Sequence, residues 1–211
     1  MQISPKVVKQ LRDKTNAGMM DCKRALAEAQ GDLAKAETIL RTKGIATASK
    51  KASRVTKEGI VASYIHLQGK VGVLVEVNCE TDFVAKNQIF RDFVKDITLH
   101  IAAAHPLYVS REDVPGSLVE AEQEIYKAQV EGQPEAVMNR IVDGKLDKFY
   151  STVCLLEQGF IKNPDQTIKE LLNTKIAELG ENIVIRRFTR YLVGEPLANE
   201  ASLASAEEVA A

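Results

Sequence analysis

The sequence lacks an excess of charge of either sign and lacks any long apolar run. Its 211 residues carry 28 Lys and Arg against 29 Asp and Glu, which gives a formal net charge of −1. Such a chain has no overall positive field to hold a polyanion or an acidic membrane surface, so we expect no direct nucleic-acid partner. No segment approaches the roughly 20 apolar residues that span a bilayer, so we also expect no membrane insertion.

Cysteines are few, odd in number and far apart: Cys22, Cys79 and Cys154. No CxxC pair is present, which is typical of reduced thiols and not of a disulfide framework, although one intermolecular disulfide stays open. The stretch MQISPKVVKQ has neither the apolar core of a signal peptide nor the Arg- and Ser-rich character of a transit peptide. We therefore expect a cytoplasmic protein, or one of the plastid stroma or an organelle matrix.

Signatures of catalysis and of cofactor binding are missing as well. There is no GxxxxGK[ST] phosphate loop, no GxGxxG, no HExxH and no GxSxG elbow. His66, His100 and His105 do not lie at metal-ligand spacing from cysteines or carboxylates, which favours strand, core or helix-end positions over ligands. We expect no cofactor, no metal and no catalytic residue, so an enzyme would need an unrecognised site.

What is present begins with three short amphipathic helices. The apolar spacing predicts one helix from Pro5, a second with a stripe from Met19 to Ala29, and a third from Leu33 that ends before Gly44. Residues 45–58 break this spacing and are basic, which indicates a linker, with partial helix left open. The alternative to a solvated basic hinge is an RNA-binding arm, but such an arm would require interleaved aromatic residues, which this stretch lacks.

From residue 60 the apolar period changes from helical to alternating. GIVASYIHL and VGVLVEVN flank a turn, which predicts a β-hairpin, and a helical stripe then runs to His105. Further helices are expected over 117–130, from 134, over 146–156 and over 168–179, before a last strand in ENIVIRRFTRYLVG. The predicted fold class is α+β: an N-terminal three-helix module, then a core of helices packed on a small antiparallel sheet.

These boundaries divide the chain into four parts. They are a module (1–44), a basic linker (45–58), a core domain (59–195) and a flexible tail (196–211) without aromatic residues. The last strand holds RRFTRY, the best nucleic-acid candidate, but alternating Arg and aromatic residues are ordinary on a half-exposed strand. A nucleic-acid or ribosome-associated protein that uses this strand with Lys50, Lys51 and Arg54 is the competing class, and the near-neutral charge counts against it.

The junction NCETDFVAKN, residues 78–87, admits two interpretations. Thr81 or Asp82 can cap the following helix, and Asp82 suits the positive end of its dipole. Phe83 extends the helical stripe backwards from Phe90, so the pattern by itself favours a buried core position. The alternative is an exposed apolar wedge beside a carboxylate, built to enter a pocket of another protein. Pattern alone does not separate them.

Three stretches resemble the translation elongation factor Ts family: LRDKTNAGMMDCKRALAEAQGD, VEVNCETDFVAKN and GENIVIRRFTRYLVGE. The likeness runs from the N-terminus to about Glu195. Members of this family are exchange factors for the GTPase elongation factor Tu. The resemblance therefore implies a guanine nucleotide exchange factor in translation elongation that acts by protein–protein binding, and an N-terminal module with a ubiquitin-associated (UBA)-like fold.

The resemblance also assigns roles to residues. Thr81, Asp82, Phe83 and Val84 match the family's TDFV element, which implies that Phe83 inserts between helices of the G domain of elongation factor Tu while Asp82 engages polar groups beside it. The resulting shift would disturb the magnesium site and the phosphate-binding loop, and GDP would leave.

The N-terminal module is similar to a surface that also docks on the G domain, with Arg12, Met19 and Met20 as contact candidates. Met19 lies on the stripe of Cys22 and Leu26, so core packing is its better explanation. Met20 lies off that stripe and is the better contact candidate.

Two features depart from the family pattern. Asn16 stands where members commonly have glycine, and because Asn tolerates the left-handed conformation we expect little change. Longer members carry two similar core halves with a dimerisation insert, whereas this chain carries one, in which TLHIAAAHP follows the TDFV helix almost directly and resembles the helix motif of the second half. Short members are thought to act as homodimers, so the resemblance implies a homodimer and leaves a contact from His100 open.

Overall fold

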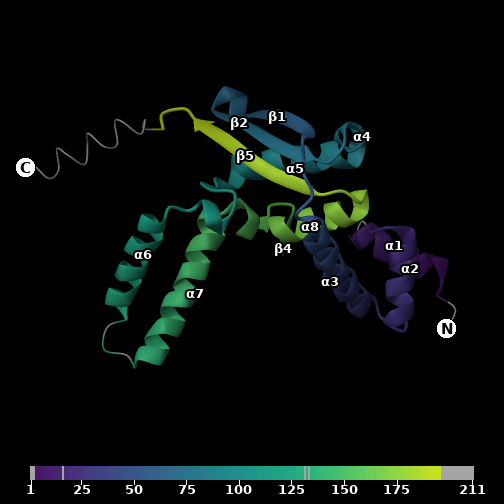
Figure 1. The fold of residues 1–211 in the computed structure, drawn as a ribbon, viewed down its shortest axis with the longest axis horizontal. Coiled ribbons are helices and arrows are strands. Elements are labelled where there is room, and N and C mark those ends of the chain that lie inside the picture. The colour runs from purple at the N-terminus through teal and green to yellow at the C-terminus, as the bar shows by residue number, and fades with distance from the viewer. Residues whose placement is uncertain (1–2, 16, 131, 133, 196–211) are drawn as a thin grey trace, which may run out of the picture.

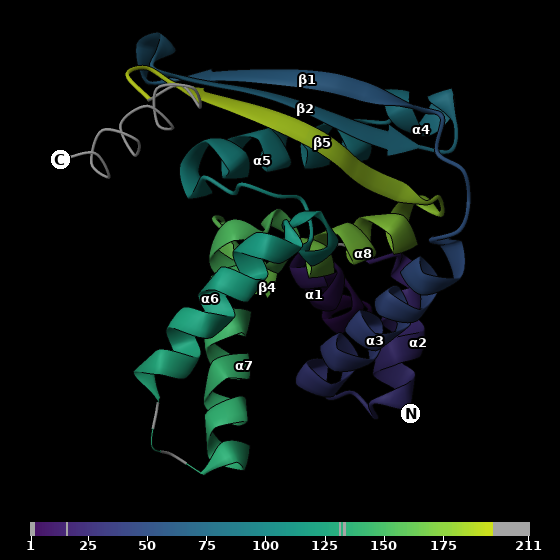
Figure 2. The same ribbon diagram turned by 60° about the vertical axis from the view of Figure 1, so that its left-hand side comes forward.

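The computed structural model of the chain describes residues 3–15, 17–130, 132 and 134–195 (Figure 1). An antiparallel sheet of order β1-β2-β5 lies along the top of the molecule in Figure 2; it is formed by β1 (Glu58–His66), β2 (Val71–Cys79) and β5 (Ile183–Leu192). Helices cover one face of this sheet, and two helical arms extend away on that side (Figure 2). The predicted α+β fold class is confirmed.

The covered face of the sheet is the one that the alternating valines occupy. In β2, Val71, Val73, Val75 and Val77 are at most 4% exposed. Two helices contact β1 and β2 from this side, α4 (Asp82–Lys86) and α5 (Gln88–Ala104) (Figure 2). Because side chains alternate between the faces of a strand, the residues between the valines form the outer face.

The central helix α5 supplies much of the core. Its buried apolar stripe consists of Phe90, Phe93, Val94, Ile97 and Ile101. The helix ends where we expected, because His105 takes a left-handed conformation with φ 51 just before a proline. Helix α8 (Ile168–Leu179) lies beneath α5 in Figure 2 and contacts it.

The first three helices enclose a small core of their own. They are α1 (Pro5–Thr15), α2 (Met19–Glu28) and α3 (Leu33–Lys51). The buried residues they share are Val8, Leu11, Cys22, Ala25, Leu26, Ala29 and Ala36. The predicted number and order of helices in this part are confirmed, while Asn16 lies outside the described residues.

The predicted end of the third helix was wrong. Helix α3 continues through Gly44 to Lys51, because its second half packs against α8. Gly44 is buried, and a Cβ atom there would lie 3.8 Å from the carbonyl oxygen of Asn173. The glycine is therefore a point of helix contact and not a stop. The division of the chain at residues 44, 58 and 195 stays a prediction, and the tail 196–211 lies outside the described residues.

The second arm is a hairpin of α6 (Gly116–Gln129) and α7 (Glu135–Val153), on the left in Figure 1. The helix expected over 146–156 is confirmed as far as Val153, but it is the second half of an unbroken α7, in which Val142 and Leu146 lie one turn apart on the same buried face. A short sheet of β3 (Gly159–Phe160) and β4 (Asn163–Thr167), which the pattern did not reveal, leads to α8. In the described part of the chain, no helix combines the length and apolar character that crossing a bilayer requires.

Candidate partner-binding site

A sharp corner joins β2 to α4 at the TDFV element. The strand ends at Cys79, and Thr81 follows in an extended conformation as the N-cap of α4. The Thr81 hydroxyl accepts a hydrogen bond from the Val84 N–H at 3.4 Å, as a threonine cap does. The cap that the sequence pattern predicted is therefore Thr81, and Asp82 is the first residue of the helix.

Phe83 projects into solvent from this corner and is 81% exposed. Its neighbours anchor the helix, since Ala85 is buried and Val84 packs against the main core. Phe83 escapes the stripe of α5 because α4 ends at Lys86 and Asn87 is extended, with its side chain capping a new helix at the Ile89 N–H (2.9 Å). The break shifts the helical phase. The buried position that the pattern favoured is thus wrong.

Asp82 lies beside Phe83 and carries its charge at neutral pH. The Lys86 ammonium donates a hydrogen bond to its carboxylate at 2.7 Å, and this contact holds the pKa of Asp82 below its usual value. The pair is solvent-exposed and therefore contributes little to folding. Its carboxylate stays accessible beside the phenyl ring, so the corner presents one apolar group and one anionic group together.

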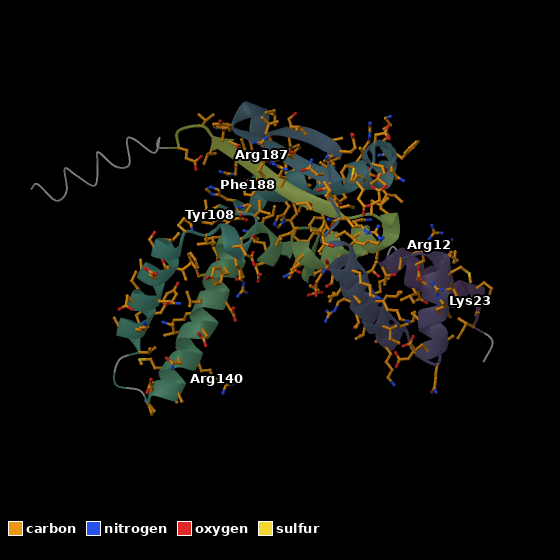
Figure 3. All side chains as sticks on the ribbon, in the orientation of Figure 1. Arg12, Lys23, Tyr108, Arg140, Arg187 and Phe188 are labelled. Atoms are coloured by element: carbon orange, nitrogen blue, oxygen red, sulfur yellow. The ribbon has the colours of Figure 1, made fainter. Side chains whose placement is uncertain are left out.

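The N-terminal candidates are exposed and lie on α1 and α2, which are on the same side of the molecule as α4 in Figure 1. Met20 is 62% exposed, in agreement with its position off the stripe, but Met19 is also 45% exposed. The core position expected for Met19 was wrong: Met19 is the first residue of α2, and the buried residues of this helix begin one turn later, at Cys22. Figure 3 labels Arg12 on α1, also exposed, and Lys23 on α2.

Several basic residues of the competing RNA-binding hypothesis form contacts within the protein. Arg187 and Arg186 both face Glu76, at 2.7 Å and 3.7 Å, and Phe188 packs against the main core (Figure 3). Arg54 pairs with Glu80 at 3.4 Å, and the Lys51 ammonium donates to the Gly180 carbonyl. These contacts leave less positive surface than the sequence suggests.

His100 lies in the core and makes no surface contact. Its Nδ1 accepts from the Ile161 N–H at 3.3 Å, so its Nε2 carries the proton that is donated to the Gln158 Oε1 at 3.0 Å. Burial lowers the pKa of His100. His100 therefore offers no exposed surface for the partner contact that the sequence left open. Within the described residues, no three His, Cys, Asp or Glu side chains gather as they would around a metal ion.

The three cysteines are free and buried in the described structure. Burial raises the pKa of Cys79 and of Cys154 to about 11, so neither forms a thiolate at neutral pH. These side chains pack as small apolar groups, and an intermolecular disulfide has no support.

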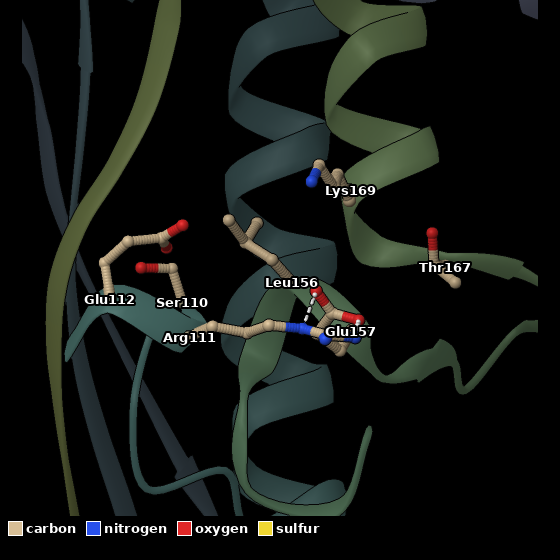
Figure 4. A pocket seen from close by; sticks show the side chains of 7 residues that line it. All are labelled: Ser110, Arg111, Glu112, Leu156, Glu157, Thr167 and Lys169. Carbon is tan, nitrogen blue, oxygen red and sulfur yellow. Dashed lines mark hydrogen bonds and ion pairs between the residues drawn. The ribbon is translucent and has the colours of Figure 1, made fainter. Parts of the chain in front are cut away.

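A hollow of about 420 Å³ lies away from the TDFV corner, beside the start of α8 (Figure 4). Its main charge, Arg111, donates to both oxygens of Glu157 at 3.0 Å and 2.8 Å and to Asp147 at 2.9 Å. The guanidinium is thus already compensated, and the arrangement is that of a structural ion-pair cluster and not of a ligand site.

Sequence reasoning missed one residue of the corner. Glu181 precedes β5, and its carboxylate accepts hydrogen bonds from the backbone of Glu80 and Thr81, one hundred residues earlier in the chain. No periodic pattern marks such a contact. The only signal was that Glu80 and Thr81 lie in one stretch that resembles the family, VEVNCETDFVAKN, and Glu181 lies in another, GENIVIRRFTRYLVGE. Nothing in the sequence indicated that the two stretches are in contact.

Comparison with known proteins finds similarity to one family across nearly the whole chain. The family model described as "Elongation factor TS" matches residues 5–195. A protein of Carboxydothermus hydrogenoformans named elongation factor Ts is 57% identical over 211 residues, which cover 99% of this chain and 97% of that protein. Proteins of the same name from Thermoanaerobacter sp. and Citrifermentans bemidjiense are 60% identical over 195 residues and 56% identical over 213 residues, with at least 92% of each chain covered.

Proposed function

Because the chain belongs to the elongation factor Ts family, we propose that it is a guanine nucleotide exchange factor for elongation factor Tu in translation elongation. It acts by binding another protein and not by catalysing a chemical step. The observation that carries this proposal is the exposure of Phe83, a large apolar side chain held in water at a capped corner. Such a group is costly to expose and is typical of a binding anchor.

An exchange factor must bind its nucleotide-free partner more tightly than its nucleotide-bound partner. Linkage then requires that the factor and GDP weaken each other's binding by the same factor. Insertion of Phe83 between helices of the G domain supplies this difference if the gap opens only when the magnesium and phosphate site is disturbed. Burying one Phe contributes roughly 1.5 to 3 kcal/mol, which corresponds to about one to two orders of magnitude in the coupling.

The rest of the TDFV element supports the wedge. Asp82 offers a charged acceptor beside the ring, while Thr81 and Val84 hold the helix from which the ring projects. Arg12, Met19 and Met20 form a second proposed contact on the UBA-like N-terminal module, because all three are exposed on α1 and α2, which are on the α4 side of the molecule in Figure 1. Two separate contacts fix the orientation of the partner better than one.

We also propose that the active form is a homodimer joined through the outer face of the sheet. Val61, Ile65, Leu74 and Tyr191 are exposed there, and Gly72 lies between Ile65 and Tyr191 in the strand register. A solvated face of an antiparallel sheet usually carries polar side chains, so this apolar face fits a second copy of the chain. We propose the cytoplasm, or the stroma or matrix of an organelle, as the place of action.

The test is release of a fluorescent GDP analogue from elongation factor Tu in the presence of excess unlabelled GDP, as the protein is titrated in. We expect release to accelerate and to saturate as the factor is added. The absence of any acceleration by the unmodified protein would refute the exchange function. RNA binding would be tested next, with a steep dependence of affinity on salt as its signature.

A further inference from the structure

The turn Gly180–Asn182, between α8 and β5, is joined to the TDFV corner by reciprocal hydrogen bonds. One oxygen of the Glu181 carboxylate accepts from the Glu80 N–H at 3.1 Å and from the Thr81 N–H at 3.0 Å. Its other oxygen accepts from the Thr81 hydroxyl at 2.6 Å. In return, the Glu80 carboxylate accepts from the Asn182 N–H at 2.6 Å. Each side of the contact thus holds the backbone of the other.

The same turn also contacts the end of α3 and the segment that follows it. The buried Asn182 side chain donates to the backbone carbonyls of Arg54, at 2.9 Å, and of Ala52, at 3.4 Å. The Lys51 ammonium at the end of α3 donates to the Gly180 carbonyl. The turn therefore joins three parts of the chain: the corner, the last strand and the segment that leads out of α3.

The bonds of Glu181 decide the orientation of the Thr81 cap. A hydroxyl has one proton, and the Thr81 hydroxyl directs it to Glu181 while its oxygen accepts from the Val84 N–H. Hydrogen bonds to an ionised carboxylate are shorter and stronger than neutral ones. Helix α4 has only five residues and cannot sustain itself, so its direction depends on what holds its first turn.

We propose that Glu181 is a positioning residue for Phe83. Through Glu80 and Thr81 it sets the direction in which the phenyl ring leaves the corner, and the turn it belongs to ties that direction to the end of α3. The two surfaces that meet the partner, on α4 and on the N-terminal helices, are thereby presented in one arrangement. This proposal rests on the exchange function proposed above.

The test compares Glu181→Gln, Phe83→Ala and the double variant in the GDP-release assay. Gln has nearly the size of Glu but lacks the charge that three donors share, so we expect the maximal release rate to fall by about tenfold, as for the loss of one charge-assisted hydrogen bond. In the Phe83→Ala background the same substitution should have no effect, because Glu181 acts through the ring. Fold-changes that multiply in the double variant would overturn the proposal.

The matched control is Glu178→Gln, the same substitution at the end of α8, where the carboxylate pairs with Lys175 at 2.8 Å. This variant should leave the release rate unchanged. If Glu181→Gln does not fold, Thr81→Val, which removes only the hydroxyl donor and cap, takes its place in the same comparison. An equal loss of rate in the Glu178→Gln control would overturn the proposal, since it would show that any charge lost from this region has the effect.

A second measurement does not depend on nucleotide exchange. Amide hydrogen exchange of the free protein should be faster at Glu80 and Thr81 in Glu181→Gln than in the unmodified protein, and unchanged at Val75 in the middle of β2. Unchanged protection at the two corner amides would overturn the positioning role. If the unmodified protein fails to accelerate GDP release, the proposed function fails, and this measurement still decides whether Glu181 holds the corner.

Discussion

Phe83 and Phe90 lie seven residues apart at one helical spacing, yet the first is 81% exposed and the second is 0% exposed. The extended backbone at Asn87 separates them, because it ends α4 and lets α5 begin in a new phase. The same residue type therefore has two environments within seven residues: Phe90 fills the core, and Phe83 lies in solvent.

Phe83→Ala should leave the stability of the protein within about 0.5 kcal/mol of the unmodified value, since the ring packs against little of the protein. It should slow GDP release by roughly one to two orders of magnitude, which is the value of one buried phenyl ring in the complex. The matched control is Ile125→Ala, which truncates an exposed apolar residue of α6. An unimpaired release rate in Phe83→Ala would refute the wedge.

Phe90→Ala should have the opposite profile. Removing a fully buried ring costs about 3 to 5 kcal/mol, so we expect the urea midpoint to fall sharply. Equilibrium unfolding followed by circular dichroism measures this change. A loss below about 1 kcal/mol would contradict the core position of Phe90 under the sheet.

Met20→Ala should weaken binding to nucleotide-free elongation factor Tu by several-fold. The Met20 side chain is exposed on α2 in the free protein and would be buried only against the partner, so the substitution removes apolar contact area from the complex alone. Titration calorimetry measures the affinity, with Val137→Ala on the exposed face of α7 as the matched control. Equal affinities for Met20→Ala and the control would remove the N-terminal module from the proposed interface.

Leu74→Arg should dissociate the proposed homodimer. It places a charge at the centre of the outer sheet face, opposite Ser63 and Thr189 in the register, where a second copy would have to bury it. Light scattering at micromolar concentration measures the mass, and Leu107→Arg, at an exposed apolar position outside the sheet, is the control. An unmodified protein that is strictly monomeric and still exchanges nucleotide would refute the dimer.

Stability should fall as the pH drops below about 6.5. Burial lowers the pKa of His100 from its usual 6.5, so the unfolded chain takes up this proton at a pH where the folded protein does not. The stabilisation that neutral His100 provides is complete above pH 6.5 and is lost as the pH falls through the folded pKa. Urea unfolding at pH 7.5 and 5.5 should show a smaller loss for His100→Gln than for the unmodified protein, and equal losses would contradict this assignment.

Local sequence patterns predicted most of the elements correctly, and the reason is visible at α8. Thr167 and Glu170 form a reciprocal capping box, with hydrogen bonds of 3.2 Å and 3.1 Å, and Gly180 ends the helix in the left-handed conformation with φ 75. Both signals act within four residues of the helix end that they define. Gly44 looks like the same kind of stop, but there contact with α8 outweighs the weak helix propensity of glycine.

Most of the helices and the main strands, the α+β class and, through the resemblance of the TDFV and N-terminal stretches, the family could be read from the sequence alone. Those properties depend on short-range periodicity, capping and residue identity. The exposure of Phe83, the burial of His100 and the hydrogen bonds between Glu181 and Thr81, one hundred residues apart, became visible in the folded structure and not in the sequence. The physical reason is that exposure depends on what packs around a side chain, and a carboxylate meets its donors only after β5 has joined the sheet beside β2.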